Sequence, residues 1–290
     1  SSGLSWKADY VAELNADDNK LDLMGWVTLN NRSGTRYNNA KMQLVAGDVN
    51  VVKNEFRKVA KSMAIREAAF DAAQEQMTEE SLFEYHLYTL KRPTTISNQQ
   101  TKQVSLLTAN QVPVNKEFLL QGNAYYYQSS YGDIGQKMKV GVYVEFQNNE
   151  KSGLGLPMPK GVVRVYKKDK KGNAQFIGED NIDHTPKNED IRLKLGDAFD
   201  ITADKKQTNF KKRTAIGKYN YAFESSYAVE LKNAKSEAVT VIVREPIPGD
   251  WKLIDETHKS KKVASGTAEW RVDVQAEGST TLKYTVLVRY

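Results

Sequence analysis

Regular alternation of apolar and polar residues is the feature that most constrains the fold of this 290-residue chain. Trp6, Ala8, Tyr10, Ala12 and Leu14 recur at every second position, and a period of two is the spacing of side chains on one face of a β-strand. The same pattern returns between short polar turns at residues 21–29, 42–46, 83–90, 101–107, 140–146, 162–166, 227–231, 239–244, 270–274 and 281–290. Such spacing predicts a mainly β chain of two antiparallel β-sandwich domains.

One segment has a helical period instead. Between Asn54 and Met77 the apolar residues recur at spacings of three, four and seven, and neither Gly nor Pro occurs. We therefore expect one amphipathic helical excursion over about 54–77. Its apolar stripe is either a contact surface for a partner or the face that packs against a neighbouring sheet.

The C-terminal part of the chain reads as a unit of its own. Five alternating runs after Lys206 supply its strands, and the Pro- and Gly-containing segment 246–250 reads as a sharp connection. Trp251 and Trp270 are expected to anchor its core. We therefore predict a β-rich domain with a helical insertion at 1–206 and an immunoglobulin-like β-sandwich at 207–290.

Three strands are expected to end in the same way. An alternating run reaches Asn30-Asn31, Asn148-Asn149 or Asn233, and a small polar turn follows in each case. Asn suits such a corner because its short side chain can bond nearby backbone groups and because it tolerates a left-handed conformation. The echo fits a repeated sandwich corner, and it also fits three unrelated turns.

The basic residues are not evenly spread. The net charge is +6, and between Lys160 and Ala215 there are 14 Lys and Arg residues against 9 Asp and Glu. This excess either attracts phosphate, nucleic acid or an anionic envelope polymer, or it marks solvated hairpin tips and edge strands. The run Lys167–Asn173 favours the second reading, because it lies between two strand-like segments as a hairpin turn does.

Several classes of protein are excluded by composition. The chain has no Cys, which excludes disulfides, thiolate nucleophiles and cysteine metal sites. It has no apolar run of about 18 residues and so no expected membrane span. Nucleophile-elbow, phosphate-loop and dinucleotide motifs are also missing, and we expect no cofactor. Because the chain opens at Ser1 without Met or a secretory signal, we expect a processed product or a fragment.

Several blocks of sequence resemble a bacterial family. They are residues 4–10 (LSWKADY), 44–47 (LVAG), 84–90 (EYHLYTL), 155–166 (GLPMPKGVVRVY), 177–186 (IGEDNIDHTP), 195–200 (LGDAFD) and 249–251 (GDW). With them the chain resembles the mucoidy-inhibitor-A-like proteins, specifically their uncharacterised C-terminal β domain. The resemblance covers nearly the whole chain and departs at 54–77. It implies a β-rich envelope or exported protein without an assigned activity, so no catalytic residue is carried over.

The densest group of acidic and histidine residues is Glu179, Asp180, Asp183 and His184. Asp180, Asp183 and His184 are the candidate metal ligands, since carboxylate oxygens bind hard cations and a His can pair with an orienting Asp. The spacing matches no known calcium or zinc motif. The alternative is structural, with these side chains bonding the backbone of the turn that contains Thr185 and Pro186.

Tyrosine is the aromatic residue in excess, with 15 copies. Tyr125, Tyr126 and Tyr127 are consecutive and Tyr131 follows closely, so we expect rings on both faces of one strand. Rings on an exposed face are candidate sugar-binding platforms. The alternative is that alternate tyrosines belong to the core. We expect no nucleic-acid partner, because no recognition module is present and the Lys runs lie far from this cluster in sequence.

The function that these observations favour is a non-enzymatic binding or assembly module of the bacterial cell envelope. Its partner is expected to be a protein or an envelope polymer, and its location extracytoplasmic, in the periplasm or at the cell surface. The alternatives are a metal-dependent hydrolase of an envelope polymer, centred on Asp180, Asp183 and His184, and a polysaccharide-binding module that uses the four tyrosines.

Overall fold

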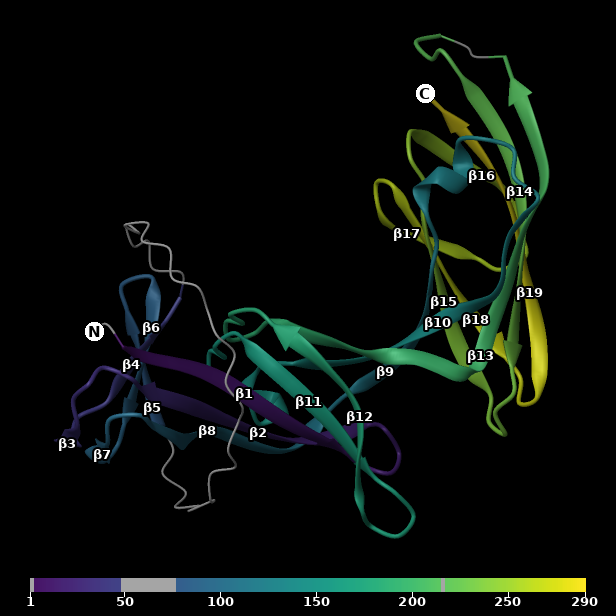
Figure 1. Ribbon diagram of the computed structural model, residues 1–290. Coiled ribbons are helices and arrows are strands. Elements are labelled where there is room, and N and C mark those ends of the chain that lie inside the picture. The colour runs from purple at the N-terminus through teal and green to yellow at the C-terminus, as the bar shows by residue number, and fades with distance from the viewer. Residues whose placement is uncertain (1–2, 48–76, 215–216) are drawn as a thin grey trace. The chain divides into compact units, whose positions relative to one another are not determined.

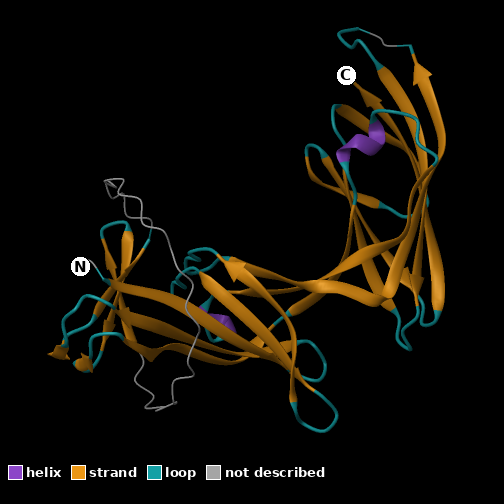
Figure 2. Cartoon of the chain, in the orientation of Figure 1, coloured by secondary structure: helices purple, strands orange, loops and turns teal. Residues whose placement is uncertain are grey.

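The computed structural model describes residues 3–47, 77–214 and 217–290, which are mainly β-strand (Figures 1 and 2). The prediction of a mainly β chain is confirmed. The predicted helix lies outside the described residues except for Met77, and Met77 is the first residue of a strand. No helix of the described residues is long and apolar enough to cross a membrane.

The chain divides into two compact units. Unit 1 comprises Ser1–Val114 and Phe146–Leu193, and unit 2 comprises Asn115–Glu145 and Lys194–Tyr290. The predicted boundary near Lys206 differs from this division, because Lys206 lies inside strand β13 (Asp190–Arg213). Strands β10 and β13 each contribute residues to both units, so each unit is built from two separate stretches of sequence.

Unit 1 contains a five-stranded sheet in the order β12-β11-β1-β2-β8, and the smaller sheets β3-β7 and β4-β6-β5. Its elements are β1 (Leu4–Leu14), β2 (Lys20–Asn31), β3 (Tyr37–Ala40), β4 (Gln43–Ala46), β5 (Met77–Leu82), β6 (Tyr85–Leu90), β7 (Thr94–Ile96), β8 (Gln100–Pro113), the 3-10 helix η2 (Glu150–Ser152), β11 (Gly161–Lys168) and β12 (Ala174–Ile182). The alternation in β1 buries Ala8, Tyr10, Ala12 and Leu14. The Tyr10 hydroxyl donates to the Pro159 carbonyl oxygen at 2.7 Å, which satisfies the buried phenol.

The basic run between β11 and β12 forms the hairpin that the sequence predicts. The two strands pair antiparallel, and the backbone N–H of Asp169 donates to the carbonyl oxygen of Asn173 at 2.9 Å. The Asp169 carboxylate also accepts from the N–H groups of Lys171 at 2.8 Å and Asn173 at 2.9 Å. The acidic side chain thus holds the turn closed.

Unit 2 contains one nine-stranded sheet in the order β16-β19-β14-β13-β10-β9-β15-β18-β17. Its elements are β9 (Asn115–Gln121), the 3-10 helix η1 (Ala124–Tyr127), β10 (Asp133–Gln147), β13 (Asp190–Arg213), β14 (Ala222–Asn233), β15 (Val239–Pro246), β16 (Asp250–Glu256), β17 (Ser260–Ala264), β18 (Thr267–Val274) and β19 (Gly278–Arg289).

The nine-stranded sheet curls into a nearly closed, barrel-like form. Its two edge strands, β16 and β17, follow one another in sequence. The short turn between them therefore brings the two edges of the sheet close together. Across the junction the Glu256 carboxylate accepts from the Trp270 indole N–H at 3.0 Å and from the Ser260 N–H at 3.1 Å. Trp270 is fully buried, as expected of a core anchor, and Trp251 packs against the same core.

The predicted sandwich and its immunoglobulin-like form are not confirmed. One curled sheet encloses the core of unit 2, where a sandwich would have two sheets packed face to face. The pairing is also not antiparallel throughout, since β1 pairs parallel with β11 and β9 pairs parallel with β15. The alternation that defines strands is the same in a sandwich and in a curled sheet, which explains the difference.

The turn after β2 is organised by a buried asparagine. The Asn31 side-chain amide donates to the carbonyl oxygens of Thr35 at 2.7 Å and Ser97 at 3.0 Å. Its side-chain oxygen accepts from the N–H of Ser33 at 3.1 Å. Asn31 has no exposed surface, so one side chain satisfies several backbone groups at a corner that water does not reach.

The turn after β14 in unit 2 is built in the same way. The Asn233 amide donates to the carbonyl oxygens of Glu237 at 2.8 Å and Gln275 at 3.0 Å, and its oxygen accepts from the N–H of Lys235 at 3.0 Å. The sequence echo between these two turns therefore marks one corner that occurs in both units. At the third predicted corner, Asn148 is also buried but bonds a different set of backbone groups.

The corners give a stability prediction. Asn31→Ala and Asn233→Ala should each lower the free energy of unfolding by about 1–3 kcal/mol, because buried carbonyl groups lose their donors. The matched control is Asn110→Ala, at an exposed position of β8, which should change it by no more than about 0.5 kcal/mol. Urea unfolding measures both, and equal effects at buried and exposed positions would contradict the assigned role.

Candidate functional site

The interior of unit 2 holds a buried charge on β13. Ile201, Ala203, Lys205 and Gln207 lie at alternating positions, and all four are buried. Alternation alone points the Lys205 side chain to the inner face, where it lies between Ala203 and the buried amide of Gln207. An ammonium group in such a place is stable only if it is paired and hydrogen-bonded.

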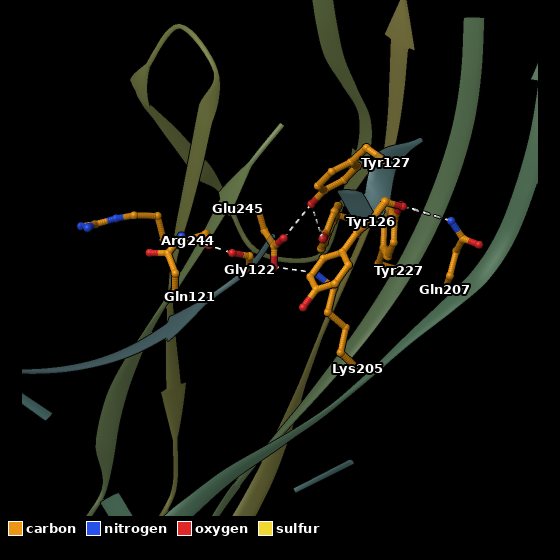
Figure 3. Close-up of polar contacts among 10 residues, drawn as sticks. Gln121, Gly122, Tyr126, Tyr127, Lys205, Gln207, Tyr227, Arg244 and Glu245 are labelled. Atoms are coloured by element: carbon orange, nitrogen blue, oxygen red, sulfur yellow. Dashed lines mark hydrogen bonds and ion pairs between the residues drawn. The ribbon is translucent and has the colours of Figure 1, made fainter. Parts of the chain in front are cut away.

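The partner of Lys205 is Glu245 on β15. Lys205 Nζ donates to Glu245 Oε1 at 2.5 Å, and neither side chain has exposed surface (Figure 3). Gly122 leaves the space for this carboxylate, because a Cβ at that position would lie 2.1 Å from Glu245 Oε2. The Gly122 N–H also donates to the Arg244 carbonyl oxygen at 2.8 Å, which fixes the close approach of β9 to β15.

This ion pair reaches across the inside of the curled sheet. Strands β10 and β9 separate β13 from β15 in the strand order, so three strand spacings, roughly 14 Å, would separate the two positions in a flat sheet. The 2.5 Å contact between the two side chains therefore depends on the curvature of the sheet.

Four tyrosines surround the ion pair. The Tyr127 hydroxyl donates to Glu245 Oε2 at 2.8 Å and lies 2.8 Å from the Tyr284 hydroxyl. The Lys205 ammonium lies 4.4 Å from the ring centroid of Tyr126, 5.2 Å from Tyr227, 5.8 Å from Tyr284 and 6.0 Å from Tyr127. Ring faces carry negative potential, so the four rings stabilise the positive charge of the ammonium group in addition to the Glu245 carboxylate.

Gln207 connects this cluster to η1. Its amide donates to the Ser129 carbonyl oxygen at 3.1 Å and to the Tyr227 hydroxyl at 3.3 Å, and its oxygen accepts from the Tyr131 N–H at 2.6 Å. The Tyr227 hydroxyl donates to the Tyr126 carbonyl oxygen at 2.6 Å. These bonds hold η1 and the residues that follow it against the inner face of the sheet.

Burial sets the protonation of the cluster. It raises the pKa of Tyr126 and of Tyr227 to about 12, and raises the pKa of Tyr127 and of Tyr284 well above the usual value. Burial also lowers the pKa of Lys205, while the nearby Glu245 carboxylate opposes that change. The phenols therefore act as neutral hydrogen-bond groups, and the arrangement can fix the curvature of the sheet.

The predicted tyrosine platform is only partly at the surface. Residues 124–127 form the 3-10 helix η1 rather than a strand, because the Asn123 side chain accepts from the Tyr125 N–H as an N-cap. Tyr126 and Tyr127 are buried, whereas Tyr125 and Tyr131 are exposed. The two exposed rings pack edge to face, with centroids 5.6 Å apart.

The candidate metal ligands lie at the end of β12 and in the loop that follows. Asp180 accepts from the Asn181 N–H at 2.8 Å, the Asp183 carbonyl oxygen accepts from the Thr185 hydroxyl at 2.9 Å, and His184 Nδ1 accepts from the Lys160 N–H at 3.2 Å. Among the described residues there is no group of three or more His, Cys, Asp or Glu residues that could hold a metal ion. A metal site at Asp180, Asp183 and His184 stays a prediction.

Sequence reasoning missed Lys205 and Glu245, although a signal was present. Lys205 continues the period of Ile201 and Ala203, and Glu245 continues the period of Val241 and Val243. A single charged residue within an apolar row of period two indicates a charge that faces the core. One such residue of each sign in the same chain predicts an internal pair.

The fold and this cluster define a mainly β protein with an ion pair inside a barrel-like sheet. The chain belongs to the family described as "Domain of unknown function (DUF4139)", whose model matches residues 1–290. The narrower resemblance to mucoidy-inhibitor-A-like proteins is not confirmed by this match. No curated protein matches the chain.

The ion pair gives a second stability prediction. Lys205→Met should lower the free energy of unfolding by about 3–5 kcal/mol, because it leaves the Glu245 carboxylate buried without its counter-charge. The double variant Lys205→Met/Glu245→Leu should recover most of the loss, since it removes both charges.

The neighbouring residue provides the control for this prediction. Lys206 pairs with Asp133 at 3.6 Å with both side chains more than half exposed, so Lys206→Met should change the free energy of unfolding by no more than about 0.5 kcal/mol. Chemical denaturation of the four proteins tests the prediction. A double variant as unstable as the single Lys205 variant would show that the unpaired Glu245 carboxylate is not the cause of the lost stability.

The tyrosines give a prediction about pH. Their phenols lose protons near pH 10 in the unfolded chain but at higher pH in the folded chain, where burial raises the pKa. This contribution to stability is complete below about pH 10 and is lost as pH rises through the raised pKa values, by up to about 1.4 kcal/mol per phenol and pH unit. Lys205, whose pKa is lowered, has the opposite effect but is a single group.

Urea midpoints between pH 8 and 11 measure this loss. We expect the midpoint to be steady up to about pH 10 and to fall above it. Tyr284→Phe should make the midpoint fall less, because it removes one phenol with a raised pKa while Tyr127 keeps its bond to Glu245. A midpoint that does not change up to pH 11 would contradict the role given to the buried phenols.

Proposed function

We propose that the chain is a non-enzymatic binding or assembly module of the bacterial cell envelope. The observation that carries this proposal is that, in unit 2, the paired charged side chains are buried whereas aromatic side chains are exposed. Lys205 and Glu245 have no exposed surface and bond each other inside the sheet, so a substrate cannot touch them. Aromatic side chains such as Tyr125 and Tyr131 are exposed instead, and exposed aromatics serve recognition.

The envelope location rests on the resemblance to the mucoidy-inhibitor-A-like proteins, and we place the chain outside the cytoplasm, in the periplasm or at the cell surface. Membership of the DUF4139 family over the whole chain is compatible with that resemblance. The mainly β fold also suits a module whose role is to present surfaces.

Polysaccharide binding is the form of this function that a specific observation favours. Tyr125 and Tyr131 are 46% and 36% exposed, and their rings stand at 73° to one another. An edge-to-face pair presents one ring face and one ring edge with polar hydroxyl groups, which suits the apolar face and the hydroxyl groups of a sugar ring. The ring of Tyr126 packs edge to face against Tyr125, with centroids 4.6 Å apart.

Retention of the full chain on purified envelope polysaccharide tests the proposal. We expect the chain to be retained and the polymer to keep its length after prolonged incubation. Tyr125→Ala and Tyr131→Ala should each weaken retention by about two- to twelvefold, since one aromatic contact contributes about 0.5–1.5 kcal/mol.

The matched control is Phe176→Ala in unit 1. Phe176 is 55% exposed and also forms an edge-to-face pair, with its ring centroid 5.6 Å from that of Tyr166. The Phe176→Ala substitution should nevertheless leave retention unchanged. Shortening of the polymer, abolished by Asp183→Ala, would support the hydrolase alternative. Equal losses at Phe176 and at the two tyrosines would show that retention does not depend on the tyrosine pair.

A further inference from the structure

The hairpin that joins β13 to β14 concentrates positive charge. Lys211, Lys212, Arg213 and Lys218 lie in or beside it, and no acidic residue occurs between Phe210 and Phe223 in the sequence. Arg213 pairs with the Glu224 carboxylate at 2.6 Å, so the three lysines supply most of the excess charge. The described residues of this tip, 211–214 and 217–221, are exposed apart from Tyr219, which is partly exposed. Figure 1 shows the tip at the far end of these two strands.

A row of aromatic rings leads from the core of unit 2 to this tip. Phe223 pairs across the sheet with Val288, and Val288 belongs to the buried core. Directly opposed residues share a face, so the ring of Phe223 lies on the inner face. It stacks on Phe210 with centroids 5.3 Å apart and lies parallel to Tyr221 at 6.4 Å. Tyr221 is 53% exposed, so the row ends in water.

Cations lie over the tyrosines at the tip. Lys212 Nζ is 5.6 Å from the ring centroid of Tyr221, and Lys218 Nζ is 5.4 Å from that of Tyr219. The Arg289 guanidinium lies 5.3 Å from the Tyr219 ring, and the Tyr219 hydroxyl donates to the Asp250 carboxylate. Ammonium groups and phenols are therefore placed side by side at one exposed end of the sheet.

We propose that this tip, Lys211–Arg213 together with Lys218–Tyr221, docks onto the anionic surface of a phospholipid bilayer. Lipid phosphates are attracted by clustered Lys and Arg side chains. Tyrosine settles at the depth of the headgroups, because its ring is apolar and its hydroxyl is polar. The net charge of +6 adds to the attraction at long range.

The same geometry favours a bilayer over a stacked sugar or base. The lysine ammonium groups lie over the faces of Tyr219 and Tyr221, and stacking needs those faces free. Contact with headgroups needs only ring edges, hydroxyl groups and nearby cations. The docking surface shares no residue with the Tyr125 and Tyr131 pair, so this inference goes beyond the proposed function.

Unit 1 contains a second basic hairpin that serves as an internal control. Its tip includes Asp169, and the carboxylates of Asp18 and Glu13 pair with Lys167 and Lys168. Lys170 and Lys171 are left at the tip and are exposed. This hairpin matches the first in having two adjacent exposed lysines, but the aromatic row is not repeated at its tip, where Asp169 is acidic. If charge reversal at Lys170 and Lys171 lowers binding as much as reversal at Lys211 and Lys212, the attraction is general; if it does not, the first tip is the docking surface.

Sedimentation of the full chain with vesicles tests the proposal. We expect binding to vesicles of phosphatidylglycerol and phosphatidylcholine, weakening as salt rises, and little binding to vesicles of phosphatidylcholine alone. Lys211→Glu/Lys212→Glu should lower binding by at least about tenfold. Lys170→Glu/Lys171→Glu should change it by less than about twofold.

Insertion of the tip has its own measurement. The emission of Tyr221→Trp should shift to shorter wavelength when anionic vesicles are added, whereas that of Phe176→Trp on the other hairpin should not. Polysaccharide retention should be unchanged by Lys211→Glu/Lys212→Glu, which separates this inference from the proposed function.

Three results would overturn the proposal. Equal binding to charged and neutral vesicles would show that lipid charge is not what the tip recognises. Equal losses from the two double charge reversals would show that the tip is not the docking surface. Binding of the tip to an acidic polysaccharide or to single-stranded DNA, without binding to vesicles, would assign the surface to that polymer.

Discussion

The ion pair between Lys205 and Glu245 is the interaction on which the structure of unit 2 depends. Two charges taken out of water lose more than their mutual attraction returns unless their other bonding positions are filled. Here the Tyr127 hydroxyl bonds the carboxylate, four rings face the ammonium and Gly122 leaves the space. Because β10 and β9 lie between the two strands, the charges meet only when the sheet is curled. In a flat sheet the two charged side chains would lie too far apart to pair. The ion pair therefore stabilises the curled form of the sheet.

This interior also separates the two roles of tyrosine in the chain. Tyr127 and Tyr284 are fully enclosed, and burial keeps their hydroxyl groups protonated as hydrogen-bond donors and acceptors. Tyr125 and Tyr221 stand at the surface, where a ring can meet a partner. The buried set restricts where the exposed set can lie, since the Tyr227 hydroxyl bonds Tyr126 in η1 and Gln207 bonds Ser129 and Tyr131 after it. Recognition by this protein thus depends on surface rings whose positions are fixed from within.

Much of the fold could be predicted from the sequence, because the relevant signals are local. Alternation locates the strands, and the hairpin after β11 follows from a turn between two such runs. The curvature of the sheet and its strand order depend on contacts between distant segments, which alternation does not specify. Lys205 lies in the basic stretch between Lys160 and Ala215, so its charge is hidden among surface charges, although its position in the alternating row points inward. Tyr125 to Tyr127 form a 3-10 helix because of the Asn123 cap, a local effect that the apolar pattern does not reveal.

The shared corner allows the two units to be compared position by position. Asn31 pairs with Leu4 and Asn233 pairs with Ile201, so counting back from each corner aligns the strand pair β1 and β2 with β13 and β14. Val27 then matches Val229, and both are fully buried. Their cross-strand neighbours are Ala8 in one unit and Lys205 in the other. The same pair of strands therefore accepts the methyl group of Ala8 in one unit and the ammonium group of Lys205 in the other. The charged interior of unit 2 thus comes from the side chains of these strands and not from their backbone arrangement.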